Sequence, residues 1–535
     1  MSSLSLTFGT ILAGGIVRPC AKRAPTRMTR LTIMLVAAFT ASPAMAAEET
    51  DKNCRNLYRL TDTTWAVEPG FLVDGTDELP AHCRVRGVVN RAIRFEVTLP
   101  LVDEWNGRLM FSAVGGGAGT LGDTSSLLGR GFAMATTDTG HELEDPDFLR
   151  QPEALLDYAY RGVHLATRVA KAVVTRYYGR DIDYAYLQGC SNGGRAALLE
   201  AIRFPDDYDG IIAGAPLFRF QESLPWAVGA GRLQRRHPLT QASLRLLDDA
   251  SRNACDLLDG VEDGVINDPR ACTDDYFNVD GLACAPGQRE GCLTPGQLET
   301  ARYMYNDVVD AKGNVISPGV LPGGEAAGDW AFWMLPNALV GNEADSIIGS
   351  MEQTLIDLMR GTSTFDVEAF DPVDDRHTLT DAMAPFDVGT ADLSEFRAHG
   401  GKLLMYQGWN DYLLRPGRAL DYLAEVERES GGVAETSEFF RLFMVPGMLH
   451  CAGGPGPWQA DYVDPLVAWR ERGEAPERIV GTHPGPSDLD HLSEASDRPG
   501  DPQSFTRPLC AYPELAEYTG QGDMLDERSF ACVAK

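Results

Sequence analysis

A serine flanked by glycines is the strongest chemical signal in this sequence. Residues 189–193 read Gly-Cys-Ser-Asn-Gly, with Ser191 at the centre. This G-x-S-x-G pattern places a serine nucleophile on a sharp turn between a strand and a helix, where flanking side chains do not fit. Apolar spacing predicts a strand over 184–188 and a helix over 195–204 on either side of it. The pattern arises easily by chance among 55 glycines, so the strand-turn-helix context is what favours a nucleophile.

A serine nucleophile needs a base, and the base needs an acid that orients it. Asp411 follows a predicted strand over 402–406, and His450 follows another over 440–445. The order Ser, Asp, His along the chain is that of α/β hydrolases. His450 is preferred among nine histidines because only it follows a late strand at a short turn containing glycine. The alternative for Asp411 is an exposed loop aspartate without a catalytic role.

The oxyanion of an acyl-transfer reaction needs two backbone donors. One is expected to be the N–H of Asn192, directly after the nucleophile. The second is expected from Gly116 or Gly117, in the glycine-rich run 115–119 that follows a predicted strand over 108–114. No G-K-[ST] completes that run, so a phosphate loop is not indicated.

Two cysteines stand beside the candidate nucleophile and base. Cys190 directly precedes Ser191, and Cys451 directly follows His450. If the three side chains assemble, the two sulfurs must lie close together. A bridge between them would join nucleophile to base across a loop of about 260 residues, worth roughly 5 kcal/mol in the loop-entropy model.

The elements that must position these residues are predicted strands and helices that alternate along the chain, as in α/β proteins. Alternating residues over 84–98 predict antiparallel strands, and further strands over 132–136 and 210–213 enclose a helix over 158–178. This alternation is lost over 218–390 and resumes with a strand over 402–406 and a helix near 418–428. We therefore predict an α/β-hydrolase domain built from 47–217 and 391–535 and interrupted by a lid subdomain over 218–390.

The beginning of the chain is typical of an export signal. Residues 1–46 hold five basic and no acidic residues, an apolar run over 31–40 and an Ala-Met-Ala end. These features predict a cleaved signal peptide and a secreted or periplasmic protein. A membrane anchor, the alternative, needs about 20 apolar residues. Either Met1 or Met28 could be the true start.

Charge and cysteine content agree with export. A net charge of −30 argues against nucleic acid or an anionic membrane as the main partner. Eleven cysteines become ten after removal of Cys20 with the signal, and an even number without C-x-x-C pairs indicates disulfides rather than zinc. The residues alone leave the pairing open, although 255 with 272, 284 with 292 and 510 with 532 form short local loops.

On the basis of these residues, the chain resembles members of the tannase and feruloyl esterase family. The similarity rests on Trp105–Arg108, Gly189–Arg195, Pro205–Pro216, Val445–Gly454 and Arg507–Cys510, which span nearly all of the mature chain. The resemblance implies Ser191 as nucleophile, Asp411 as acid and His450 as base. It also implies the disulfides Cys190–Cys451, Cys54–Cys83, Cys255–Cys272, Cys284–Cys292 and Cys510–Cys532. One departure is Gln407-Gly408, where the family often has His-Gly.

The resemblance also implies a calcium ion in the lid, and the residues support it independently. Three carboxylates fall within eight residues, between glycines that allow tight bends, and hard oxygen ligands of this kind suit Ca²⁺. The expected ligands are Asp256, Asp259, Asp263 and the carbonyls of Val261 and Val265. The alternative is a solvated acidic loop. We expect the ion to be structural, and no organic cofactor.

Together these features predict a secreted serine esterase that hydrolyses esters of aromatic acids, of the feruloyl or galloyl type. Its partner would be a small aromatic ester, with Trp330 and Trp333 as walls of the pocket. The alternatives are a hydrolase of terephthalate monoesters, a serine peptidase, or a non-catalytic calcium-stabilised binding protein on the same scaffold. The oligomeric state stays open.

Overall fold

A mixed ten-stranded sheet forms the centre of the computed structural model, which describes residues 50–145, 147–336, 346–359, 365–485 and 504–534. The predicted signal peptide, with Cys20, lies outside these residues. The strands are, in sheet order, β1 (Trp65–Val67), β3 (His82–Val89), β4 (Ile93–Pro100), β6 (Ala133–Thr137), β5 (Arg108–Ala113), β7 (Tyr184–Cys190), β8 (Gly210–Gly214), β11 (Lys402–Gly408) and β12 (Phe440–Val445), with β2 (Phe71–Val73) paired to β3. Pairing is antiparallel from β1 to β6 and parallel from β6 to β12.

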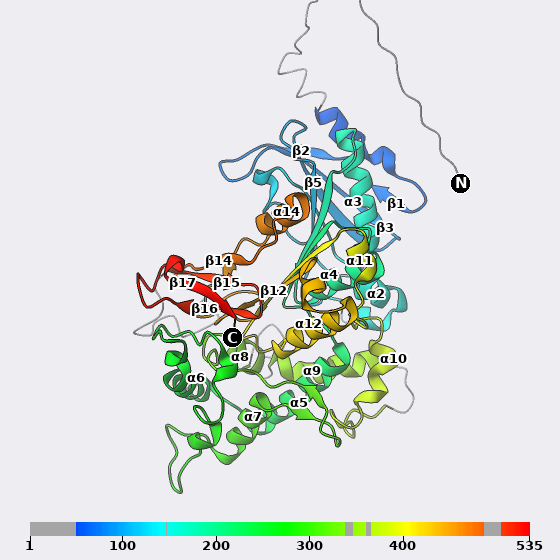
Figure 1. Cartoon of the computed structure of the whole chain (residues 1–535). Coiled ribbons are helices and arrows are strands. Elements are labelled where there is room, and N and C mark those ends of the chain that lie inside the picture. The colour runs from blue at the N-terminus through cyan, green and yellow to red at the C-terminus, as the bar shows by residue number, and fades with distance from the viewer. Residues whose placement is uncertain (1–49, 146, 337–345, 360–364, 486–503, 535) are drawn as a thin grey trace, which may run out of the picture. The chain divides into compact units, whose positions relative to one another are not determined.

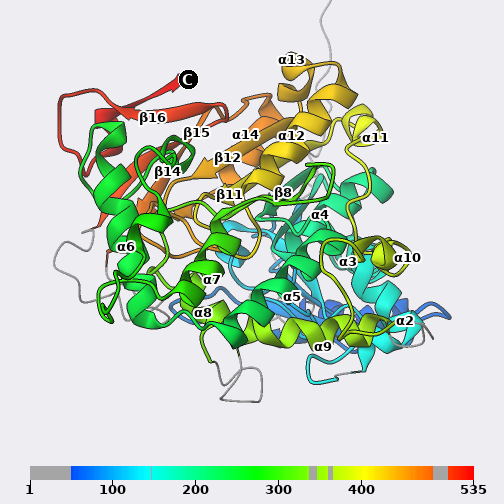
Figure 2. The ribbon, with the colours of Figure 1, turned by 90° about the horizontal axis from the view of Figure 1, so that it is seen from below.

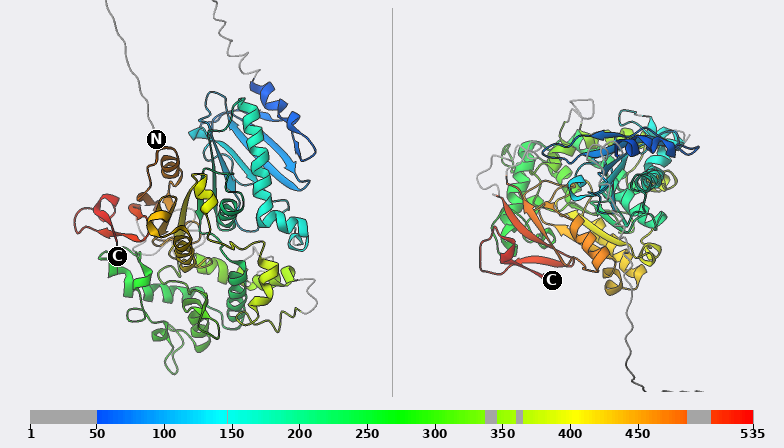
Figure 3. Two further views of the ribbon diagram at one scale, coloured as in Figure 1. Left: turned by 45° about the vertical axis from the view of Figure 1, so that its right-hand side comes forward. Right: turned by 90° about the horizontal axis from the view of Figure 1, so that it is seen from above.

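Both faces of the parallel strands are covered, which explains their continuous apolar runs. Successive residues of one strand enter different cores: Leu187 packs in the larger apolar cluster and Tyr186 in the smaller one. The larger cluster is completed by helices α3 (Gly162–Tyr178), α4 (Asn192–Arg203) and α12 (Gly417–Ser430), and the smaller one by α14 (Val463–Arg472). Figure 3 shows α3 lying along the strands. This is the predicted α/β-hydrolase architecture.

The register of the parallel strands gathers the ends that carry chemistry. Ala113 of β5 pairs with Gly189 of β7, and Cys190 pairs with Gly214 of β8. Gly408 of β11 pairs with Val445 of β12. Because parallel strands end at the same edge, the loops after β5, β7, β11 and β12 meet there, as in other open α/β sheets.

A largely helical insertion, which contains the predicted lid over 218–390, separates in sequence two strands that are direct neighbours in the sheet. Leu403 of β11 pairs with Ile211 of β8, yet residues 215–401 separate these strands in sequence. The intervening elements, shown from below in Figure 2, are α5 (Phe220–Arg236), α6 (Gln241–Cys255), α7 (Pro295–Tyr305), α8 (Asp329–Met334), α9 (Ile347–Met359), α10 (Thr380–Met383), α11 (Ser394–Ala398) and the short strands β9 (Val308–Val309) and β10 (Val315–Ser317). Capping boxes at Thr240 and Thr294 fix the starts of α6 and α7. One apolar cluster is formed by residues of this insertion, which we call the lid, together with Tyr412 from the loop after β11.

The remaining α-helices and strands belong to the same compact unit as the central sheet. They are α2 (Pro152–Leu156), α13 (Val433–Ser437), the sheet β13 (Gln459–Ala460), β14 (Arg478–His483) and β15 (Phe505–Cys510), and the hairpin β16 (Glu514–Tyr518) with β17 (Phe530–Ala534). The hairpin lies beside the lid (Figure 1), where Asn267 donates to the carbonyl of Ala516 at 2.7 Å. Within the described residues, no helix has the length and apolar character needed to cross a membrane.

Candidate active site

Ser191 occupies the predicted strand-to-helix turn in a strained backbone conformation. Its φ and ψ angles are 63° and −122°, and α4 begins at the next residue. A side chain on Gly189 would place its Cβ 2.5 Å from the carbonyl oxygen of Gly193, and one on Gly193 would lie 2.5 Å from the carbonyl oxygen of Ala113. Only glycine fits at either position, so the glycines of the pattern have the steric role that the sequence predicts.

The candidate acid and base are hydrogen-bonded to each other. His450 Nδ1 lies 2.8 Å from Asp411 Oδ2, and Asp411 is 1% exposed. The same oxygen accepts a hydrogen bond from Gln407 Nε2 at 3.0 Å, while Oδ1 accepts from the N–H of Leu414 at 2.8 Å. Three donors thus fix the carboxylate, which leaves His450 Nε2 as the nitrogen available to a nucleophile.

The surroundings of His450 favour its protonated form. Burial lowers the pKa of the imidazole, but the charge and hydrogen bond of Asp411, with the charge of Asp329, outweigh burial and raise the pKa above its ordinary value of 6.5. An imidazole with a raised pKa is a stronger base, which favours uptake of a proton from a nucleophile.

A disulfide joins the loop of Ser191 to the loop of His450. Cys190 and Cys451 are bonded with a Cα–Cα distance of 6.0 Å across 261 residues of sequence. Cys451 Sγ also lies 3.8 Å from His450 Nε2, so the bridge is adjacent to the nitrogen that does not contact Asp411. The structure therefore hydrogen-bonds the candidate acid to the candidate base, and it links the residue after His450 covalently to the residue before Ser191.

Similarity to known proteins decides the family. The model of the family "Tannase and feruloyl esterase" matches residues 79–533. The chain belongs to this family. It is 32% identical over 532 residues to mono(2-hydroxyethyl) terephthalate hydrolase from Piscinibacter sakaiensis, with 85% of each chain covered. It is 33% identical over 467 residues to a protein of Arthroderma benhamiae named "Probable feruloyl esterase", with 83% of each covered.

A solved structure supports the same assignment. The crystal structure of feruloyl esterase B from Aspergillus oryzae matches with a TM-score of 0.75 and 25% identity, over 90% of this chain and 100% of that one. The relatives are esterases, so this member of the tannase and feruloyl esterase family is a carboxylic ester hydrolase. The alternative of a non-catalytic binding protein has no support among them.

The disulfides of this esterase are those that the resemblance implies. Besides the bridge at the site, the bonded pairs are Cys54–Cys83, Cys255–Cys272, Cys284–Cys292 and Cys510–Cys532. Four of the five bridges thus close local loops of 8 to 29 residues, and only the one at the site spans most of the fold.

The glycine-rich loop after β5 lies against the nucleophile. A Cβ on Gly115 would be 3.8 Å from Ser191 Cβ, whereas one on Gly116 would have no atom within 4 Å. The hydrogen bonds of the described residues do not use the N–H groups of Gly116 and Gly117. Their carbonyls are engaged instead, because Tyr158 donates to Gly116 O at 3.0 Å and His141 Nε2 lies 2.7 Å from Gly117 O. Both N–H groups remain candidates for the second oxyanion donor.

Arg195 connects the two arms of the candidate oxyanion hole. Its fully buried guanidinium donates to Asn192 Oδ1 and to the carbonyls of Ala159, Tyr158 and Phe386. Asn192 Nδ2 in turn donates to the carbonyl of Val114, at the end of β5. Sequence reasoning assigned no role to Arg195 or to Gln407. For Arg195 a usable signal is its position three residues after Asn192, which puts both on one face of α4.

The predicted calcium ligands have donor chemistry that fits a hard cation. Asp256 Oδ1 is buried without a hydrogen-bond partner, and Asp259, Asp263 and Val265 line a cavity of about 20 Å³, enough for one water-sized sphere. Burial, together with the neighbouring charges of Asp263 and Asp256, raises the pKa of Asp259 to about 7. A cation would offset this repulsion.

The geometry of the same group is not that of a closed site. Asp263 is paired with Arg507 at 2.6 Å, and the three carboxylates are not among the described groups whose ligand atoms all lie within 4.8 Å of one another. Binding of one ion by all three carboxylates therefore requires their oxygens to move closer together.

The two tryptophans that the sequence places at the pocket have different surroundings. The ring of Trp333 lies 6.3 Å from that of His450, nearly perpendicular to it. Trp330 is 2% exposed and packs against Tyr305 and Tyr412 in the apolar cluster of the lid. Trp333 thus borders the candidate site directly, whereas Trp330 belongs to the packing beneath it.

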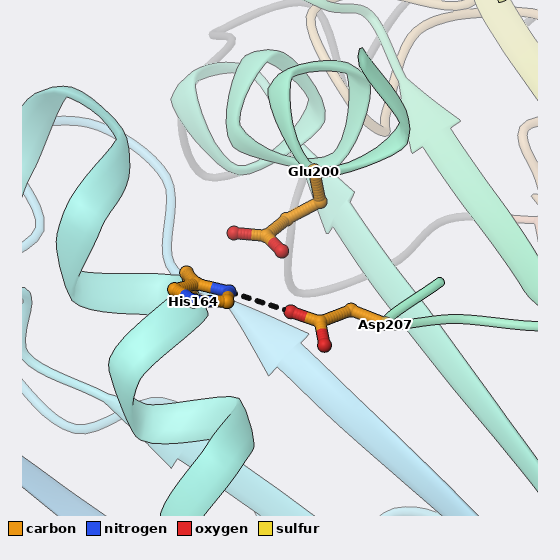
Figure 4. Close-up of side chains that lie close together, drawn as sticks. All are labelled: His164, Glu200 and Asp207. Carbon is orange, nitrogen blue, oxygen red and sulfur yellow. Dashed lines mark hydrogen bonds and ion pairs between the residues drawn. The ribbon is translucent and has the colours of Figure 1, made fainter. Parts of the chain in front are cut away.

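One further cluster of titratable groups lies toward the other end of α4. Among the described residues, His164, Glu200 and Asp207 form the group whose possible ligand atoms all lie within 4.8 Å (Figure 4). His164 Nδ1 is 2.7 Å from Asp207 Oδ2, and Lys171 Nζ is 3.6 Å from the other oxygen of Asp207. Burial and the charge of Asp207 raise the pKa of Glu200 well above its ordinary value. Since Lys171 already offsets the charge of Asp207, we assign no metal here.

Proposed function

We propose that this protein is an exported serine esterase that hydrolyses esters of aromatic acids through a covalent acyl-enzyme. The observation that carries the proposal is the Asp411–His450 hydrogen bond of 2.8 Å, joined through Cys451 and Cys190 to the strained turn of Ser191. Nucleophile, base and acid are thereby held on three loops at one edge of the sheet.

The first half of the reaction forms the acyl-enzyme. His450 Nε2 takes the proton of Ser191 as Oγ attacks the ester carbonyl, and Asp411 holds the imidazole in the tautomer with its proton on Nδ1. The N–H of Asn192, with that of Gly116 or Gly117, donates to the oxyanion of the tetrahedral intermediate. The intermediate collapses as the C–O bond to the alcohol breaks, and His450 returns the proton to that alcohol.

The second half releases the acid. A water molecule replaces the alcohol, gives its proton to His450 and attacks the acyl carbon. Collapse of this second intermediate breaks the bond to Ser191 Oγ, which recovers its proton from the imidazolium. Every proton that leaves a nucleophile is thus returned to a leaving group, and the enzyme ends as it began.

The substrate class follows from the aromatic border of the site and from the relatives. Trp333 stands beside His450 and can stack on a planar acyl group. We infer an ester of a hydroxylated aromatic acid, of the feruloyl or galloyl type. A terephthalate monoester is the second candidate, favoured by the 32% identity to mono(2-hydroxyethyl) terephthalate hydrolase.

Calcium and export complete the proposal. Asp256, Asp259, Asp263 and the carbonyls of Val261 and Val265 would hold a Ca²⁺ ion that neutralises their charge and stabilises the lid. Five disulfides favour an oxidising compartment, in agreement with the predicted signal peptide and a secreted or periplasmic location.

The decisive experiment combines labelling with a substrate panel. A fluorophosphonate should label the wild type and a control variant, Ser437→Ala, but not Ser191→Ala, and only Ser191→Ala should lose hydrolysis of a chromogenic acyl ester. Ser191→Ala with normal activity would contradict the mechanism. Relative kcat/KM values for methyl ferulate, methyl gallate and mono(2-hydroxyethyl) terephthalate then distinguish the two substrate classes, and turnover of peptide amides would indicate a peptidase.

A further inference from the structure

A second buried carboxylate lies under the candidate base. Asp329 is the first residue of the lid helix α8 and is buried. Its Oδ2 accepts a hydrogen bond from the backbone N–H of His450 at 2.9 Å and lies 3.4 Å from the N–H of Tyr412. Neither the sequence pattern nor the assignment of acid and base involves this residue.

The position of Asp329 connects two loops that must be aligned. Tyr412 directly follows Asp411, so one oxygen of Asp329 contacts the loop of the acid and the loop of the base together. These loops follow β11 and β12, while Asp329 comes from the insertion between β8 and β11. Asp411 and His450 are thus carried by loops of the central sheet, whereas the carboxylate that contacts both loops belongs to the lid.

The two hydrogen bonds do not by themselves explain why residue 329 is a charged aspartate. A neutral asparagine could accept from the same N–H groups, whereas an ionised carboxylate in this environment is costly. Burial and the charge of Asp411 raise the pKa of Asp329 to about 6, and the positive charge of His450 acts in the opposite direction. Above pH 7 the group is therefore mostly ionised, with two carboxylates facing one imidazole.

We propose that Asp329 is a positioning residue of this esterase: it anchors the loop that bears His450 to the loop that bears Asp411, and its charge stabilises the imidazolium that forms in each half of the reaction. The charged groups around the pair are consistent with this role. His450 faces Asp411 and Asp329, and Asp411 also faces the guanidinium of Arg415, which offsets part of its charge. The negative charge of Asp329 compensates for this loss and stabilises a protonated His450.

This inference rests on the proposed serine mechanism, and its test separates the two. Asp329→Asn keeps the shape and one acceptor but removes the charge, so kcat on a chromogenic ester should fall about tenfold with KM within twofold of the wild type. The acid limb of kcat/KM against pH should move to lower pH by about half a unit or more, because the imidazole has lost a negative neighbour. A purely structural residue would not move that limb.

A matched variant controls for the loss of any buried carboxylate. Asp387 is also buried, accepts from the N–H of Phe220 at 2.6 Å, and has a pKa that burial raises to about 6. Asp387→Asn should leave the acid limb in place. An unchanged kcat and acid limb in folded Asp329→Asn would overturn the inference, as would an equal shift of the limb in Asp387→Asn. If Ser191→Ala, measured in parallel, kept full activity, the proposed mechanism itself would fail instead.

Discussion

Removal of the bridge between Cys190 and Cys451 should cost both stability and activity. The bridge closes a loop of 261 residues, within which the bridges Cys255–Cys272 and Cys284–Cys292 shorten the effective chain by only about a tenth. The loop-entropy model then gives a loss of about 5.5 kcal/mol for the double variant Cys190→Ala with Cys451→Ala. Unfolding entropy for about 490 residues is about 1 kcal/mol per degree, so the Tm should fall by about 5 °C.

The pair Cys284 and Cys292 provides the control, because its loop spans only 8 residues. The same model gives about 2.5 kcal/mol for its double alanine variant, and hence a Tm decrease of about 2 to 3 °C. Scanning calorimetry measures both variants against the wild type. In parallel, kcat on a chromogenic ester should fall at least tenfold in the first variant, since a displacement of about 1 Å between nucleophile and base is enough for such a loss. The control should keep its kcat.

Two results would contradict this role of the bridge: wild-type kcat in the Cys190 and Cys451 variant, or equal Tm decreases for the two pairs. The first result would mean that packing alone aligns Ser191 with His450. The second would mean that loop length does not govern the contribution of these bridges.

Four further predictions concern single groups. Activity should fall as pH decreases through the pKa of His450, with a midpoint of kcat/KM above 6.5, because the protonated imidazole cannot accept the serine proton; a midpoint near 5 would contradict this. For protein held at a free Ca²⁺ concentration of 100 times the Kd, chelation of Ca²⁺ should lower the Tm by about 3 °C. Ca²⁺ but not Mg²⁺ should restore the Tm, and Asp259→Asn should show a smaller decrease on chelation. Arg195→Lys should lower kcat tenfold or more, since an ammonium lacks the planar guanidinium that donates to Asn192 and three carbonyls at once; unchanged steady-state kinetics would remove Arg195 from the site. Gln407→Leu should cost about 1.4 kcal/mol in kcat/KM by removing a donor from the acid, and Gln407→His should cost less.

The sequence was most informative where chemistry imposes a local pattern. The turn of Ser191 is recognisable because its glycines are sterically required within five residues, and the order of acid and base follows from the strand order of the fold. The strands on either side of the lid could likewise be read from their apolar runs, since both faces of these strands are buried.

Contacts between distant segments left no such pattern. Asp329 and His450 are 121 residues apart, and nothing in the spacing of either indicates that they meet. Trp330 and Trp333 are the same residue type and lie in the same helix, so the sequence does not distinguish them. Only the packing of α8 on the apolar cluster of the lid places Trp330 in that cluster and Trp333 at its margin. The helix predicted over 158–178 lies within a continuous helical run from Pro152 to Tyr178. What the apolar spacing did not indicate is that Asp157–Arg161 forms a π-helical turn, from which Tyr158 reaches the glycine-rich loop.

The placement of the lid between neighbouring strands has a consequence for the order of assembly. Strands β11 and β12 pair locally with each other, but β11 can join β8 only after the intervening residues 215–401 have been drawn into a closed loop. Closure of so long a loop is entropically costly, and contacts of high sequence separation form slowly. Ser191 is carried by the first segment and both of its partners by the last, so hydrolysis should be the final property that a refolding chain acquires.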